Sequence, residues 1–159
     1  MEGNPHFTEL LQELSAHHVE FLIIGGYAVM KYTEPRFTKD LDIWVRNTPE
    51  NAKRVYAALA EFGAPLRSDG VNAQDFTSYD ITYQIGRPPL RADILTHIDG
   101  VAFQDAWTRR ASGKMGGVHV YFISLEDLIR NEDLIRNKEA AGRSSDIEHL
   151  KQLRKKKRK

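Results

Sequence analysis

The pattern of apolar and polar residues predicts that the chain begins with a helix, a strand and a second helix. Apolar residues at helical spacing, with a proline suited to the first turn, predict a helix over residues 5–17. The compact, β-branched run Val19–Ile24 predicts a buried strand, because it ends at the glycine pair Gly25-Gly26. A short helix is expected over residues 27–32, before Pro35 breaks it.

A second strand is predicted over residues 40–45, where polar and apolar side chains alternate. Asp40, Asp42 and Trp44 share one face of this strand, and the intervening Leu, Ile and Val share the other. The chemistry is therefore expected on the aspartate face. Thr48 and Pro49 then supply the N-cap and first position of a helix that Gly63 ends.

The rest of the chain predicts further strands and helices. In order these are an irregular connection over 64–78, antiparallel strands 81–85 and 90–95 joined by 86–89, a helix over 101–110, a strand over 118–123, and a helix from Ser124 to beyond residue 150. This series predicts an α/β (α+β) fold, in which helices flank a mixed β-sheet.

The C-terminal helix contains a tandem repeat of the hexapeptide Glu-Asp-Leu-Ile-Arg-Asn, at residues 126–131 and 132–137. Six residues rotate a helix so that the copies point about 120° apart and bury different faces. Leu128 and Ile135, seven positions apart, can share a face. We interpret the repeat as a local duplication that lengthens the helix by about 9 Å.

Composition and charge narrow the function classes. The 159 residues suit one domain, predicted over residues 1–153, and the absence of cysteine excludes disulfides and cysteine-ligated zinc. With no apolar stretch long enough to span a bilayer, we expect a cytoplasmic protein without a membrane partner. Residues 154–159 form a basic tail with six positive charges, whereas the remaining chain has 17 basic and 22 acidic residues. Such a tail is either a solvated helix end or a phosphate contact.

Three features together indicate a metal and triphosphate site. Gly25-Gly26 follow the first strand, Asp40 and Asp42 lie on one face of the second, and Asp93 lies on a later strand. Two carboxylates on one strand face repel each other, and a hard cation between them relieves that repulsion. The glycines would let the backbone approach phosphates closely at a helix N-terminus. For the third acidic position, Asp75, Asp80 and Asp99 are less well-placed alternatives.

This combination resembles the DNA polymerase beta-like nucleotidyltransferase superfamily. That superfamily places Gly-Gly or Gly-Ser before a helix, an Asp-x-Asp strand next, and a third acidic residue on a later strand. The segment over residues 21–45 is similar to the small, stand-alone bacterial branch related to abortive-infection and toxin–antitoxin nucleotidyltransferases. The resemblance is specific over residues 19–46 and looser over 90–150.

The resemblance implies a nucleotidyltransferase fold, a nucleoside triphosphate substrate and Mg²⁺, with Mn²⁺ as the alternative ion. Asp40, Asp42 and Asp93 would be the catalytic and metal-binding residues. The nucleotide-binding residues would be Gly25, Gly26, Arg36, Thr38, Lys39, Lys138 and Arg143. The acceptor would be an RNA or protein hydroxyl, and a separately encoded toxin or antitoxin could be a partner.

One other interpretation of the function stays open. A non-catalytic module of the same fold could bind a nucleotide or a partner without transferring anything. The histidines show no zinc spacing, so structural or surface roles are expected for them. Trp44 and Trp107 are expected to be packing residues, although Trp44 could instead form a wall of the pocket.

Overall fold

Six strands form one mixed sheet in the order β3-β4-β2-β1-β6-β5. The computed structural model of the chain describes residues 5–35, 40–87 and 90–138. The strands are β1 Phe21–Ile24, β2 Asp40–Val45, β3 Thr82–Arg87, β4 Leu90–Leu95, β5 Ala111–Met115 and β6 Val118–Phe122. β2 is antiparallel to β1 and parallel to β4, β1 is parallel to β6, and the outer strands β3 and β5 are antiparallel to their neighbours. The predicted α/β class with a mixed sheet is confirmed.

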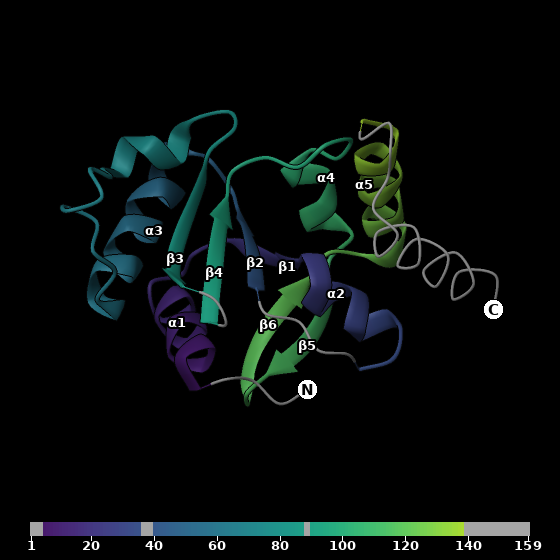
Figure 1. Cartoon of the computed structure of the whole chain (residues 1–159), viewed down its shortest axis with the longest axis horizontal. Helices are drawn as coiled ribbons and strands as arrows, with labels where there is room; N and C mark the ends of the chain where they lie inside the picture. The colour runs from purple at the N-terminus through teal and green to yellow at the C-terminus, as the bar shows by residue number, and fades with distance from the viewer. Residues whose placement is uncertain (1–4, 36–39, 88–89, 139–159) are drawn as a thin grey trace.

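Helices lie on both sides of the sheet. They are α1 Pro5–Ala16, α2 Gly25–Tyr32, α3 Pro49–Phe62, the 3₁₀ helix η1 Ala73–Thr77, α4 Phe103–Thr108 and α5 Leu125–Lys138. Figure 1 shows α1 and α3 together on one side of the strands, with α2, α4 and α5 on the other. Within the described segments, no helix combines the length and apolar character needed to cross a membrane.

The central strand β2 separates the core from the polar face. Leu41, Ile43 and Val45 are fully buried on one face, and each such side chain stabilises the fold by roughly 1.5–3 kcal/mol. Asp40 and Asp42 are half-buried on the opposite face. A shift of one residue in the pairing register of β2 would exchange its two faces and bury both carboxylates in the core. The apolar side chains therefore hold the aspartates on the other face.

Local sequence signals set several helix ends as predicted. The Thr48 hydroxyl accepts a hydrogen bond from the Asn51 amide at 3.3 Å, and Gly63 ends α3 in the left-handed conformation at φ +99°. At the start of α5, the Ser124 hydroxyl accepts from the Asp127 amide at 3.1 Å. The predicted extension of this helix beyond residue 150 lies outside the described residues.

Strand β5 is the element that the sequence pattern did not predict. Its residues, Ala-Ser-Gly-Lys-Met, contain no apolar run and no β-branched or aromatic residue. The signal lies in the turn, since Gly116 and Gly117 have φ of +55° and +81° and join β5 to β6 as a two-residue hairpin. The predicted helix over 101–110 is shorter, as α4, and the predicted irregular segment 64–78 contains η1.

Asn51 ties α3 to the ends of β1 and β2. It is fully buried, its Oδ1 accepts from the Glu20 amide at 2.8 Å, and its Nδ2 donates to the carbonyls of Glu20 and Arg46 at 3.1 and 2.8 Å. The Glu20 carbonyl also accepts from the Arg46 amide at 3.1 Å, but the Glu20 amide and the Arg46 carbonyl would lose these partners if the side chain were removed.

We expect Asn51→Ala to lower the free energy of unfolding by about 2–3 kcal/mol, because it leaves buried backbone groups unsatisfied. Urea denaturation of the purified variant measures this loss. The matched control is Asn47→Ala, which removes a 3.4 Å hydrogen bond to the Ser78 carbonyl and should cost less than about 0.5 kcal/mol. Equal losses for the two variants would contradict the structural role of Asn51.

Candidate active site

The pairing of β1, β2 and β4 brings the predicted acidic residues onto neighbouring positions of one sheet face. Asp42 is paired with Ile24 of β1 on one side and with Asp93 of β4 on the other. Asp40, two residues earlier on the same face, is paired with Arg91. Adjacent strands lie about 4.8 Å apart, so the carboxyls of Asp42 and Asp93 are close neighbours.

Arg91 forms ion pairs with two of the three aspartates. Its Nη2 lies 2.8 Å from Asp40 Oδ2, and its Nε lies 3.2 Å from Asp93 Oδ1. The second contact is poorly aligned, and both of its atoms are buried without a hydrogen-bond partner. No motif marked Arg91 as a site residue, although its position two residues before Asp93 places it on the same strand face.

The environment of Asp42 favours the neutral carboxyl. Burial raises its pKa from 3.8 to about 7, and the charges of Asp93 and Asp40 add to the effect while Arg91 opposes it. The pKa of Asp93 is also raised by burial, against the opposing influence of Arg91. The site therefore concentrates more negative charge than the protein alone neutralises.

Gly25 lets the backbone approach the Asp42 carboxylate. Its φ is +67°, and a Cβ atom at this position would collide with the Asp42 carboxylate. α2 begins at Gly25, and no side chain caps its N-terminus. The first amides of α2, including that of Gly26, are therefore open to an anion beside Asp42.

The donor chemistry of the site fits a hard divalent cation. Carboxylate oxygens are the ligands that Mg²⁺ and Mn²⁺ prefer, and Asp93 Oδ1 is buried without a hydrogen bond. Among the described residues, however, no three acidic or histidine side chains are already gathered closely enough to hold a metal ion. Arg91 instead partners Asp40 and Asp93. A cation at this site would have to compete with Arg91 for those carboxylates.

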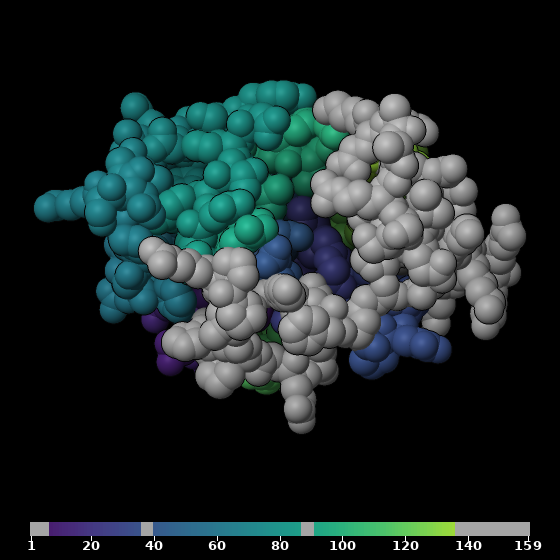
Figure 2. Space-filling view, in the orientation of Figure 1, coloured from purple at the N-terminus to yellow at the C-terminus, as the bar shows by residue number. Residues whose placement is uncertain are grey.

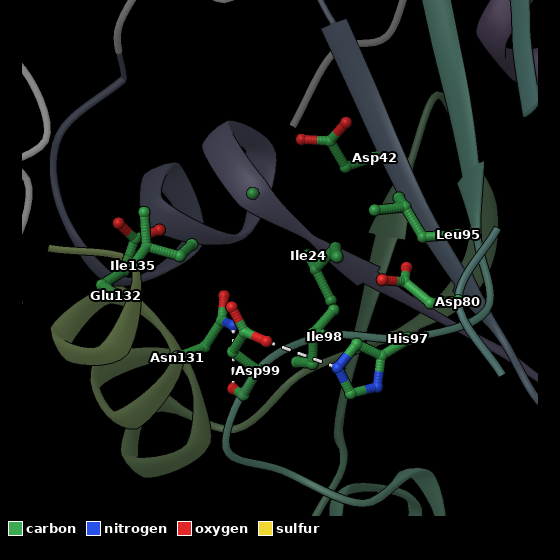
Figure 3. Close-up of a pocket in the computed structure, with 11 residues that line it drawn as sticks. Ile24, Asp42, Asp80, Leu95, His97, Ile98, Asp99, Asn131, Glu132 and Ile135 are labelled. Carbon is green, nitrogen blue, oxygen red and sulfur yellow. Dashed lines mark hydrogen bonds and ion pairs between the residues drawn. The ribbon is translucent and has the colours of Figure 1, made fainter. Parts of the chain in front are cut away.

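A cavity of about 340 Å³ adjoins Asp42 and Gly25. It is lined by residues of the β1–α2 turn, β2, the segment before β3, the end of β4, the loop after β4, and α5. These residues are Ile24, Gly25, Asp42, Asp80, Leu95, His97, Ile98, Asp99, Asn131, Glu132 and Ile135. Figure 2 shows a hollow beside the β3–β4 surface. In Figure 3, Asp42 lies at one end of this space and Asn131, Asp99 and His97 lie around the other.

Several of the predicted nucleotide-binding side chains lie outside the described part of the chain. Arg36, Thr38, Lys39 and Arg143 lie outside the described residues, and Lys138 is the last residue of α5, with its side chain outside them. The alternatives to Asp93 lie elsewhere: Asp75 caps η1, whereas Asp80 and Asp99 line the cavity.

The two tryptophans pack as expected. Trp44 is 1% exposed and meets the Phe103 ring edge-on at 5.0 Å, and Trp107 stacks on Phe103 at 5.7 Å. Neither tryptophan lines the cavity. His97 and Asn131 do line the cavity, and no local motif in the sequence marks them as site residues.

Solved structures share this fold. The lincomycin-bound lincosamide antibiotic adenylyltransferase LnuA is 15% identical, with a TM-score of 0.58 and coverage of 96% of each chain. The antibiotic-resistance factor ANT(2'')-Ia is 14% identical, with a TM-score of 0.62 over 93% of this chain and 80% of its own. An antigenic nucleotidyltransferase-like protein from Paracoccidioides brasiliensis is 19% identical, with a TM-score of 0.54 over 91% of this chain and 71% of its own. At these identities the likeness shows the fold alone.

Sequence comparison identifies the family. No curated protein matches the chain. A family model described as a nucleotidyl transferase of unknown function, DUF2204, matches residues 5–159. This match agrees with the mixed sheet, with the glycine pair beside Asp42, and with the resemblance drawn from the motifs. The chain therefore belongs to the DUF2204 family of nucleotidyl transferases.

Proposed function

We propose that the protein is a Mg²⁺-dependent nucleotidyltransferase that moves a nucleoside monophosphate from a nucleoside triphosphate to an acceptor hydroxyl and releases pyrophosphate. The observation that carries the proposal is the contact between the Gly25 backbone and the Asp42 carboxylate, with Asp93 directly opposite on β4. A phosphate-binding helix start and a pair of acidic residues thereby share one point of the sheet.

We assign the following roles to residues of this chain. The amides of Gly25 and Gly26 bind the triphosphate at the start of α2. Asp40, Asp42 and Asp93 would hold the cation, and Asp93 would also face the acceptor hydroxyl. The chemistry supplied by bound Mg²⁺ is a lower pKa of that hydroxyl and neutralisation of charge on the phosphates and pyrophosphate.

Arg91 is the counter-charge of the site before the cation binds. Its ion pairs with Asp40 and Asp93 offset part of the repulsion among the three carboxylates. We infer that Arg91 would release these carboxylates when a cation is held there, and that its guanidinium would then be available to phosphate oxygens. A planar guanidinium with several donors suits phosphate oxygens.

Other assignments remain predictions of the sequence resemblance. Arg36, Thr38, Lys39, Lys138 and Arg143 are proposed phosphate or nucleotide contacts. An RNA or protein acceptor and a separately encoded toxin or antitoxin partner are likewise implied by the resemblance.

We expect Asp42→Asn to reduce nucleotide transfer roughly 100-fold or more, because the amide cannot replace a carboxylate as a cation ligand. Purified protein, Mg²⁺ and labelled triphosphates are incubated with RNA, protein and small-molecule acceptors, and labelled product and pyrophosphate are measured. Glu61→Gln, an exposed change on α3, is the control and should keep full activity. Full activity in the Asp42→Asn protein would refute the assignment of the site.

The stability of the metal-free protein should depend on pH through Asp42. Its folded-state pKa is raised from 3.8 to about 7, so its stabilising contribution is present below 3.8 and is lost as the pH rises through 7. Each pKa unit corresponds to about 1.4 kcal/mol, and we expect a loss of roughly 1–3 kcal/mol between pH 5 and pH 8. Thermal unfolding at a series of pH values in EDTA measures it.

Asp42→Asn is the matched comparison for this pH series. The neutral amide has no charge to bury, so the variant should be more stable than the natural protein at pH 8 and should lack this part of the pH dependence. At pH 8, added Mg²⁺ should raise the stability of the natural protein but not that of Asp42→Asn. Identical pH profiles for the two proteins would show that Asp42 ionises normally.

A further inference from the structure

The β4–α4 loop, residues 96–102, is fixed at its start by a buried threonine. Thr96 is 6% exposed, its amide donates to the Ile81 carbonyl at 3.0 Å, and its hydroxyl accepts from the Ile81 amide at 2.8 Å. Ile98 and Val101 of the same loop are also buried. The beginning of the loop is therefore tied to the segment before β3.

α5 holds the middle of the loop through a hydrogen bond. Asn131 is 7% exposed, and its Nδ2 donates to the Asp99 carbonyl at 3.0 Å. Figure 3 shows the two residues beside each other. A buried amide group that loses its acceptor is costly, so this bond fixes the backbone at residue 99 against the helix.

A second contact between α5 and the loop involves Leu134. A Cβ atom at Gly100 would collide with the Leu134 side chain, which therefore lies directly against the loop backbone. Gly100 has a φ of +83°, a left-handed conformation that suits glycine. Leu134 is 37% exposed and is not a lining residue of the cavity. Its packing acts on the loop alone.

The duplicated hexapeptide supplies both contacts. Asn131 ends the first copy, and Leu134 belongs to the second. Leu128, the equivalent of Leu134 in the first copy, is 1% exposed in the core instead. The two copies thus bury different faces, as the rotation of about 120° predicts. The second copy extends α5 along the β4–α4 loop.

The loop presents an aromatic ring to the cavity. His97 is a lining residue, its Nε2 lies 3.4 Å from Asp99 Oδ1, and its ring lies 4.5 Å from the Tyr79 ring. A chain of contacts therefore runs from Asn131 through Asp99 to the His97 ring. An aromatic ring held in a fixed position suits a planar nucleobase.

The cavity continues from the proposed triphosphate site. Gly25 and Asp42 line one part of it, and His97, Asp99 and Asn131 line another, as Figure 3 shows. Phosphates bound at the start of α2 occupy the first part, and the nucleoside attached to them extends toward the second. The volume of about 340 Å³ lies near the lower end of the range for small-molecule sites, which suits a nucleoside.

We propose that Asn131 and Leu134 are positioning residues for the nucleoside of the substrate, because they hold the β4–α4 loop with His97 in the cavity wall. The inference rests on the proposed nucleotidyl transfer, since it starts from a triphosphate bound at Gly25-Gly26. Neither positioning residue acts on the reacting atoms. They determine how tightly the triphosphate binds, and the rate of the transfer step does not depend on them.

The test separates the nucleoside from the phosphates by comparing nucleoside triphosphates with inorganic tripolyphosphate. ATP, GTP, CTP, UTP and tripolyphosphate are each titrated into the full-length protein with Mg²⁺ by calorimetry. Tripolyphosphate has the phosphates but no nucleoside, so its binding reports on the glycine amides and the cation alone. We expect at least one nucleoside triphosphate to bind about tenfold or more tightly than tripolyphosphate.

Two variants test the contacts that hold the loop. Asn131→Leu keeps the approximate volume of the side chain but removes the donor, and Leu134→Ala removes the packing against Gly100. Each should weaken binding of the tightest nucleoside triphosphate about threefold or more and should change tripolyphosphate binding by less than about twofold. In the transfer assay, each should raise KM while kcat at saturating triphosphate stays close to that of the natural protein.

Leu134→Ala isolates the loop, because Asn131 itself lines the cavity and Leu134 does not. The matched control for Asn131→Leu is Asn72→Leu, which removes a 3.2 Å hydrogen bond from the Asp75 amide outside the cavity lining. The control should leave the binding of both ligands unchanged. Thermal unfolding identifies any variant that fails to fold. If Asn131→Leu unfolds, Leu134→Ala, at an exposed position, carries the test alone.

The outcomes separate the positioning role from the proposed reaction. Unchanged triphosphate binding in Leu134→Ala would overturn the positioning role, as would equal losses of triphosphate and tripolyphosphate binding. Binding of all four nucleoside triphosphates no tighter than that of tripolyphosphate would overturn the placement of the nucleoside beside His97. A natural protein that binds neither kind of ligand would contradict the proposed nucleotidyl transfer itself, and the positioning role with it.

Discussion

The repulsion among three aspartates on the central strands is the constraint on which the rest of the site depends. Asp42 and Asp93 face each other across β2 and β4, and Asp40 lies two residues away. Burial and these neighbours raise the pKa of Asp42 to about 7, and Arg91 offsets only part of the repulsion. The fully buried opposite face of β2 prevents the strand from moving the carboxylates away. The strain is thus built into the sheet, and a bound cation would relieve it.

The sequence predicted the parts of the site that depend on local pattern. Alternation along residues 40–45 placed Asp40 and Asp42 on one face, and Gly25-Gly26 marked the turn whose backbone lies against Asp42. The pairing of Asp93 with Asp42 depends on strand order, which periodicity does not show and which the family resemblance supplied. Strand β5 was not predicted because it contains no apolar run and no β-branched or aromatic residue, and its hairpin is marked by Gly116-Gly117.

The cavity lies beyond what a single sequence can predict. Its lining joins residues 24–25, 42, 80, 95–99 and 131–135, which come together only because β1, β2 and β4 are neighbours and α5 lies along the same side. The hexapeptide duplication is visible in the sequence, but which of its residues reach the cavity depends on where α5 packs. Asn131 and Glu132, adjacent across the boundary of the two copies, both reach the cavity.

The most direct test of the central claim is the position of the cation. Crystals grown with Mn²⁺ and a non-hydrolysable nucleoside triphosphate analogue would locate the ion by its anomalous scattering. We expect Mn²⁺ within about 2.2 Å of carboxylate oxygens from Asp42 and Asp93, with phosphates at the Gly25-Gly26 amides and Arg91 withdrawn from Asp40. Mn²⁺ bound elsewhere, with the ion pairs of Arg91 intact, would contradict it.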